Sequence, residues 1–405
     1  MNEKTIVKQA KQILDQYHLC DSCLGRLLRT ISTDSTNKQK GKLIRNKLQQ
    51  KQEILEKDCW LCEGLTAEID HFVELITHTM NEYEFDTFLI GSKIDEDIQE
   101  RETKIQELIS CEEAEPIKME INREIGKSIE EKLGKTVNFE SPDIMVIMDT
   151  AFDVVTLQIR SLYLYGRYKK FKRGIPQTKW PCKICRGTGC RSCNYSGKMY
   201  KTSVEELVSN QALELTKGSD ESFHGCGRED IDALMLGNGR PFILEIKNPK
   251  KRTINLNTLQ SDINSSTKNK IEISELRFSD KKEIERIKKA TFQKTYRIVM
   301  ESTNPIKKEK LKEVAQLLPG VTIKQLTPTR VAHRRANKVR ERYIYNCKIE
   351  SVEGSIARLI LEAQSGTYIK ELISGDSGRT TPNISDMIGI PCKVKELDVI
   401  HIKGE

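Results

Sequence analysis

Eight of the twelve cysteines in this chain of 405 residues are arranged as four CxxC pairs. The N-terminal sequence is charged and lacks the apolar core of a signal peptide, and no run of about 18 apolar residues occurs that could span a membrane. We therefore expect a cytoplasmic protein, in which disulfides are rare, and we interpret the CxxC pairs as metal ligands.

The four pairs lie in two places, and their members are Cys20, Cys23, Cys59, Cys62, Cys182, Cys185, Cys190 and Cys193. Two CxxC pairs together can form a tetrahedral four-cysteine zinc site, which leaves no open position for chemistry. We therefore expect one or two structural zinc ions. The spacing leaves open whether each set of four binds its own ion or whether pairs from the two places share ions.

The net charge of +8 is concentrated in two basic runs, at 160–201 and 330–342. The first run contains a dozen Lys and Arg and no acidic residue, and its cations alternate with aromatic residues. This pattern is typical of contacts with a nucleic-acid backbone and its bases, although a solvated basic surface would look similar. The residues we predict to contact RNA are Arg167, Lys169, Lys170, Arg173, Arg334 and Arg335.

The length predicts two or three domains, and helical and strand-like patterns both occur throughout, so we expect an α+β multidomain protein. Residues 1–65 form a helical segment that carries the first cysteine set. Residues 66–175 form a separate α+β unit, 176–201 a cysteine-rich connector, and 202–405 a larger mixed α/β domain. In that domain, Ser203 and Glu206 form a capping box that predicts the start of a helix.

A glycine-rich polar loop, 225–230, lies between strand-like runs and ends at Asp230. Such a loop can present a carboxylate in a cleft on a rigid support, although an aspartate here could also be a turn or capping residue. The chain then passes Asp232 and is predicted to turn at 237–239. Signatures of dinucleotide binding, P-loops, serine hydrolases and zinc peptidases are absent from the sequence, so no standard redox, kinase or hydrolase chemistry is indicated.

The stretch GREDIDALMLGNGRPF resembles the catalytic stretch of the archaeal and eukaryotic tRNA pseudouridine-54/55 synthases. GTYIKELISGDSGRTTPNI is similar to a later motif of that family, and RGIPQTKW, LTPTRVAHRR and the cysteine pairs fit its archaeal form. The resemblance implies a C-terminal pseudouridine synthase fold with a mixed, mainly antiparallel sheet, flanking helices and a central cleft. It also implies that the N-terminal part is a zinc-containing, THUMP-like RNA-binding domain.

By this resemblance, Asp230 matches the catalytic aspartate, Tyr296 the active-site tyrosine, and Lys370 the basic residue that pairs with the aspartate. The bacterial relatives have Arg at the Lys370 position. With Lys370, the pair with the aspartate in this chain keeps its charge but loses the bidentate geometry that Arg provides. The resemblance further places three residues against the substrate uracil, namely Tyr368, Ile369 and Leu397.

The resemblance implies isomerisation of uridine at position 54, 55 or both in the T arm of tRNA, on a base flipped out of the helix. It also implies that the reaction uses no organic or nucleotide cofactor. We expect a monomer that binds the tRNA elbow and no membrane. Two alternatives are a non-catalytic zinc-containing tRNA-binding factor and another THUMP-bearing tRNA-modifying enzyme. The second would need a methyl-donor or ATP-binding loop, and the sequence contains neither.

Overall fold

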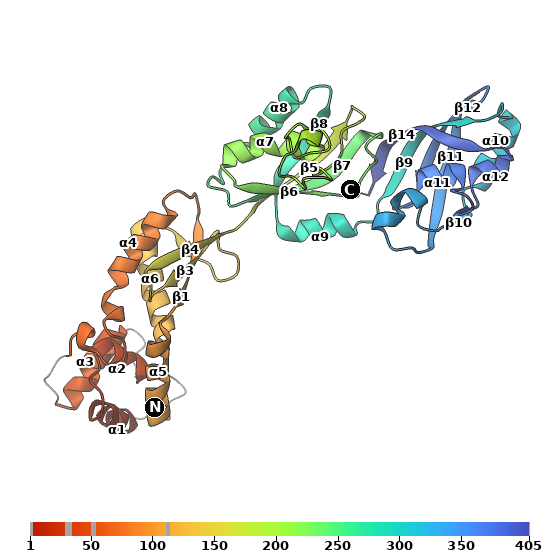
Figure 1. Ribbon diagram of the computed structural model, residues 1–405. Helices are drawn as coiled ribbons and strands as arrows, with labels where there is room; N and C mark the ends of the chain where they lie inside the picture. Colours follow the sequence, from red (N-terminus) through yellow and green to blue (C-terminus); the bar gives the residue numbers. More distant parts are fainter. Residues whose placement is uncertain (1–2, 29–34, 50–53, 111–113, 405) are drawn as a thin grey trace. The chain divides into compact units, whose positions relative to one another are not determined.

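The computed structural model describes residues 3–28, 35–49, 54–110 and 114–404, apart from the side chain of Arg334. The chain divides into two compact units (Figure 1). Unit 1 comprises Met1–Arg160 and Asn248–Thr253, and unit 2 comprises Ser161–Lys247 and Ile254–Glu405. Among the described residues, no helix is both long and apolar enough to cross a membrane.

Unit 1 is a four-stranded sheet with helices. Its helices are α1 (Glu3–Leu14), α2 (Asp21–Leu27), α3 (Asn37–Lys47), α4 (Ile69–Met80), α5 (Glu96–Ile109) and α6 (Ile117–Leu133). Its strands are β1 (Thr87–Lys93), β2 (Thr136–Val137), β3 (Ile144–Asp149) and β4 (Val154–Ile159), in the order β2-β1-β3-β4. Strand β1 is parallel to β2 and β3, whereas β3 and β4 are antiparallel.

The N-terminal helices share one hydrophobic core with the sheet and with α5 and α6, so 1–65 is not a separate segment as predicted. Arg26 on α2 is fully buried and pairs with Glu102 on α5 and, at 3.5 Å, with Glu120 on α6. Helix α3 approaches α2 so closely that a Cβ at Gly25 would lie 1.9 Å from the carbonyl oxygen of Asn37. These contacts explain why the N-terminal helices fold as part of unit 1.

Unit 2 is built on a ten-stranded sheet. Its strands are β5 (Leu162–Lys170), β6 (Asp220–Gly225), β7 (Leu234–Lys247), β8 (Ile271–Ser279), β9 (Gln293–Ser302), β10 (Thr322–Gln325), β11 (Arg340–Glu353), β12 (Ile356–Ala363), β13 (Thr380–Thr381) and β14 (Cys392–Lys403). Their order is β13-β10-β11-β12-β9-β14-β7-β5-β8, and β6 pairs with β7. The β14–β7 pair is parallel and the other strand pairs are antiparallel, which confirms the predicted mixed, mainly antiparallel sheet.

The helices of unit 2 are α7 (Val204–Thr216), α8 (Leu256–Ser266), α9 (Lys281–Lys289), α10 (Lys308–Leu317), α11 (Ile369–Ser374) and α12 (Ile384–Ile388). Helices α7 and α8 lie near β8, and α10, α11 and α12 lie at the other end of the sheet (Figure 1). The predicted helix start is confirmed, because the Ser203 hydroxyl caps α7 by accepting a hydrogen bond from the amide of Glu206. The Glu206 carboxylate accepts from that hydroxyl and not from the Ser203 amide, so the reciprocal bond of a full capping box is not formed between these two residues.

Strand β5 places the boundary between the units earlier than predicted. It pairs with β7 and β8 in the large sheet, so the predicted boundary at residue 175 is wrong and the division follows Arg160. The cysteine-rich connector 176–201 also belongs to unit 2, and Asn248–Thr253 belongs to unit 1. The sequence pattern did not indicate this because strand partners are distant in the chain.

The segment 237–239 lies within strand β7 and is not the predicted turn, and the register of pairing with β5 shifts there, between Met235 and Arg240. Gly237 and Gly239 have φ of +61° and +73°, a left-handed conformation that favours glycine. The Asn238 side chain donates to the carbonyl of Ile402 at 2.8 Å and accepts from its amide at 3.1 Å. These bonds hold β7 beside β14 and allow one strand to continue through both glycines.

Candidate active site

A cavity of about 340 Å³ opens in unit 2 where the 227–230 loop, β9, β14 and the start of α11 meet. The residues predicted for catalysis and uracil binding all line it, namely Asp230, Tyr296, Tyr368, Ile369, Lys370 and Leu397. These residues come from four separate parts of the sequence, and the sheet brings them together.

Asp230 lies between two cations. Its Oδ2 is 3.3 Å from Nζ of Lys370, and its Oδ1 is 3.2 Å from Nη1 of Arg330. Arg330 is held in turn by Glu371, whose Oε1 is 2.7 Å from the Arg330 Nε. Each carboxylate oxygen of Asp230 therefore has its own cationic partner, and the side chain remains 31% exposed toward the cavity.

Asp232 shares the ammonium group of Lys370, which lies 2.9 and 3.1 Å from its two carboxylate oxygens. Partial burial opposes ionisation of Asp232, but the hydrogen bond from Lys370 outweighs it and lowers the pKa of the carboxyl group. The Asp232 side chain is 69% exposed and does not line the cavity. The geometry thus separates the two aspartates, since only Asp230 faces the cavity.

Tyr296 on β9 is 8% exposed, and burial raises the pKa of its hydroxyl to about 12. The hydroxyl therefore keeps its proton at neutral pH. The backbone of Tyr368 is held by the fully buried Gln325, which donates to its carbonyl at 3.0 Å and accepts from its amide at 2.9 Å. Ile369 and Leu397 are buried and supply apolar surface to the cavity.

A buried ionic network supports the loop that carries Asp230. The Glu229 carboxylate lies 2.9 Å from Nε of Arg240 and 3.6 Å from Nζ of Lys170, and it accepts a hydrogen bond from the hydroxyl of Tyr168 at 2.8 Å. Nζ of Lys170 also donates to the carbonyl of Asp230 at 3.4 Å. Burial disfavours ionised Glu229, but Arg240 and Lys170 outweigh that effect and lower the pKa of its carboxyl group.

Two cations of the first basic run are therefore not available to RNA, and the prediction for them is wrong. Arg167 is 2% exposed and donates to the carbonyls of Asn238 and Gly239 at 2.7 and 3.1 Å. Lys170 is fully buried in the ionic network. Both side chains are buried and donate hydrogen bonds to backbone carbonyl groups. The sequence pattern could not identify these contacts.

The other predicted RNA contacts remain accessible to different degrees. Lys169 is 31% exposed and lies 2.9 Å from Glu272, and Arg173 is 33% exposed and pairs with Asp398 at 2.7 Å. Arg335 is exposed at the cavity. Arg334 was also predicted to contact RNA, but its side chain lies outside the described part of the structure.

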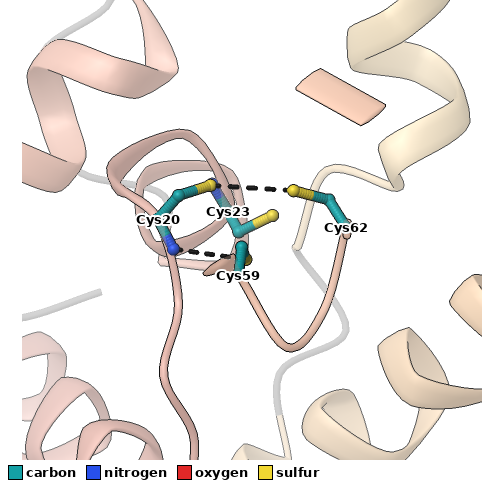
Figure 2. A group of neighbouring side chains, drawn as sticks. All are labelled: Cys20, Cys23, Cys59 and Cys62. Carbon is teal, nitrogen blue, oxygen red and sulfur yellow. Dashed lines mark hydrogen bonds between the residues drawn. The ribbon is translucent and has the colours of Figure 1, made fainter. Parts of the chain in front are cut away.

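The cysteines form two separate groups, one in each unit. Cys20, Cys23, Cys59 and Cys62 are buried together, and Figure 2 shows the Cys20 amide directed at Cys59 and the Cys20 sulfur at Cys62, over 3.2 and 3.8 Å. The second group is Cys182, Cys185, Cys190 and Cys193. Within each group the four sulfur atoms lie within 4.8 Å of one another, and none of the described cysteines forms a disulfide. Both donor sets fit a zinc ion.

Arg330, Glu371 and Lys294 line or support the cavity and were not predicted as site residues. Arg330 lies in the second basic run and Glu371 follows Lys370, so both were visible as charges within noted motifs. Their contact with each other and with Asp230 depends on the fold. Lys294 lies two residues before Tyr296, and the alternation of a strand places both on the same face.

Comparison with protein families gives two matches. Residues 163–403, more than half of the chain, match the model described as "Pus10, C-terminal". The chain belongs to the Pus10 family. Residues 72–149 match the Pus10 THUMP domain of the archaeal type, which confirms the THUMP-like character of unit 1.

The relatives that match over nearly the whole chain include two that are named tRNA pseudouridine synthase Pus10. The protein of Methanothrix thermoacetophila is 37% identical over 98% of this chain and 95% of its own length. That of Methanocaldococcus jannaschii is 40% identical over 96% of this chain and 93% of its own. A solved Cbf5-Nop10-Gar1 complex aligns with 58% of this chain and 48% of its own at 14% identity and a TM-score of 0.32, too low a likeness to support an argument.

Proposed function

We propose that this Pus10 chain is a tRNA pseudouridine synthase that isomerises uridine to pseudouridine at position 54, 55 or both in the T arm. The observation that supports this best is the position of Asp230, which faces a cavity beside Tyr296 and lies between Lys370 and Arg330. The names of the full-length relatives support the same reaction.

The reaction requires that the C1′–N1 bond of a uridine breaks, that a C1′–C5 bond forms, that C5 loses its proton and that N1 takes up a proton. Asp230 acts as the nucleophile or base on a uridine flipped out of the RNA stack. Lys370 and Arg330 hold the Asp230 carboxylate in place at the cavity. In the bacterial relatives, an Arg at the position of Lys370 can contact both carboxylate oxygens at once. In this chain Lys370 and Arg330 each bind a different oxygen of Asp230, so the two cations together replace that bidentate contact.

The uracil binds against the ring of Tyr296, with Tyr368, Ile369 and Leu397 forming the rest of the pocket. Because the hydroxyl of Tyr296 stays protonated near neutral pH, it can donate a hydrogen bond to the base. The reaction needs no organic cofactor, since it transfers no group to or from another molecule. All the residues of the site come from one chain, so we expect a monomer to suffice.

The tRNA is bound by cations around the cavity and by the THUMP domain. Arg335 is the best placed of the predicted phosphate contacts, because it is exposed and lines the cavity. Lys169 and Arg173 are partly accessible and would have to exchange their carboxylate partners for phosphates. A tRNA elbow is recognised through its shape and backbone, which suits such a set of contacts.

Each cysteine group holds one structural zinc ion in this proposal, which gives two ions per chain. The first ion would connect the start of α2 to the segment before α4, because Cys20 and Cys23 lie at α2 and Cys59 and Cys62 precede α4. The second ion would close the connector on itself. Four cysteine ligands leave neither ion an open position for chemistry.

The test is to incubate the protein with an unmodified tRNA transcript without cofactors and to map pseudouridine by carbodiimide labelling. The wild type should label the T loop, and Asp230→Asn should not. Asp232→Asn is the matched control, because it removes the neighbouring carboxylate that does not line the cavity, and it should retain activity. Full activity in Asp230→Asn would refute the proposed nucleophile. Binding of tRNA without any label in the wild type would favour a non-catalytic binding factor.

A further inference from the structure

Lys294 is a buried cation that faces the cavity without a partner. It lies on β9 and is 9% exposed, and it lines the cavity together with Tyr296. Among the described residues, no hydrogen bond or ion pair joins its Nζ to another group, and Glu229 and Cys226 act on it only by attraction over a longer distance. A buried ammonium group without a partner is strongly unfavourable, so such groups usually have a ligand or a function.

The other buried cations of unit 2 are paired, which makes Lys294 distinct. Arg240 binds Glu229 and donates from Nη1 to the carbonyl of Cys226 at 2.7 Å, and Lys170 donates to three backbone carbonyls. Lys294 lies close to the catalytic loop, because a Cβ at Gly227 would lie 2.9 Å from its Nζ. Its ammonium group is therefore near the loop of Asp230 and available to a ligand.

The depth of Lys294 indicates which part of the nucleotide it contacts. Exposed and half-buried arginines line the cavity as well, namely Arg330, Arg335, Arg340 and Arg342. A phosphate is strongly hydrated and suits these more accessible cations, whereas the flipped base enters the buried part beside Tyr296. The acceptors that a uracil offers there are its two carbonyl oxygens.

We propose that Lys294 is a catalytic residue that donates a hydrogen bond to a carbonyl oxygen of the flipped uracil. This inference rests on the proposed function. When the C1′–N1 bond breaks, its electron pair stays on the base and is shared with both carbonyl oxygens. The Lys294 ammonium stabilises that developing charge, as a preorganised donor in an oxyanion hole does.

The test compares Lys294→Met with the wild type in single-turnover kinetics on a T-arm transcript, with tRNA affinity measured separately. Loss of one such donor should lower the rate at saturating enzyme by about 100-fold or more and change tRNA affinity little. Lys294→Gln keeps a neutral donor and should recover part of the rate. Lys348→Met is the control, because Lys348 is exposed on β11 and does not line the cavity.

Transcripts with 2-thiouridine or 4-thiouridine at the target position show whether the contact is to the base. Sulfur accepts hydrogen bonds weakly, so one thio substitution should slow the wild type and have little further effect on Lys294→Met. Equal slowing of both proteins by each thio substitution would refute the contact.

The pH dependence provides a further measurement. Burial and the nearby Arg240 lower the pKa of Lys294 to about 8, while Cys226 and Glu229 act in the opposite direction. Lys294 is active when protonated, so the wild-type rate should fall as pH rises through about 8, and Lys294→Met should lack this decrease. If the wild type shows no decrease there, the proposal is refuted.

Two further results would overturn the proposal. An unchanged saturating rate with weaker binding and a lower salt dependence would assign Lys294 to a phosphate instead. Unchanged rate and binding together would assign it no role in the reaction. All these comparisons require an active wild type. A wild type that forms no pseudouridine would refute the proposed function itself, and this result differs from those that refute the role of Lys294.

Discussion

Two neighbouring lysines on β5 allow a direct test of what the buried network contributes to stability. Lys170 is fully buried and lies 3.6 Å from Glu229, whereas Lys169 is 31% exposed and lies 2.9 Å from Glu272. Glu229→Gln and Glu272→Gln therefore remove the same charge from two Lys–Glu pairs, one of which is buried and also includes Arg240. We expect a large effect for the first substitution and a small one for the second.

The magnitude follows from the partners left behind. Glu229→Gln leaves Arg240 and Lys170 buried without their carboxylate, and breaking a buried pair in this way costs about 3–5 kcal/mol. Glu272→Gln leaves a partly solvated ammonium group, and such surface pairs contribute about 0–1 kcal/mol. The expected difference between the variants is therefore about 2–5 kcal/mol in the free energy of unfolding.

The assay is urea unfolding followed by the fluorescence of Trp180, in a Trp60→Phe background, so that the signal comes from unit 2 alone. The pKa of the Glu229 carboxyl group is lowered from 4.5 by folding. Its contribution to the free energy of unfolding is therefore fully present above pH 4.5 and disappears as the pH falls through the lowered pKa. The two variants should thus differ most above pH 4.5 and converge in acid. Equal destabilisation near neutral pH, or a difference that grows in acid, would refute the argument.

The remaining predictions concern catalysis, RNA binding and metal. Arg330→Gln should lower the single-turnover rate by about tenfold or more, because one oxygen of Asp230 loses its cation, and an unchanged rate would contradict this role. Arg335→Gln should weaken the binding of tRNAs of any sequence to a similar extent and reduce the slope of log affinity against log salt by about one. An unchanged slope would show that Arg335 is not part of the interface. Cys20→Ser and Cys182→Ser should each lower the zinc content by about one ion per chain, measured by mass spectrometry of the metal, whereas a wild type without zinc would refute both sites.

The residues of the site were largely predictable because they lie in long motifs that resemble one family. Asp230, Tyr296 and Lys370 were identified in this way, and the structure places all three at one cavity. The sequence could not choose between Asp230 and Asp232 by spacing alone. The structure separates them by exposure, since Asp232 contacts the same lysine from outside the cavity.

The basic runs show where sequence reasoning reaches its limit. Composition predicted the charge of 160–201, but it could not tell that Arg167 and Lys170 are buried whereas Lys169 is partly exposed. Burial depends on which strands flank β5, and these strands are far away in the chain. For the same reason, the domain boundary was predicted too late.

The CxxC spacing by itself determined that two groups of four ligands were possible, since ligand spacing is a local property of the chain. Local patterns likewise determined the capped start of α7 and the mixture of helices and strands. Only the tertiary structure decided the separate grouping of the cysteines, the second cation on Asp230 and the unpartnered Lys294. These features depend on contacts between segments that are far apart in the chain, such as Asp230 and Arg330, which are 100 residues apart and are brought together by sheet pairing and packing.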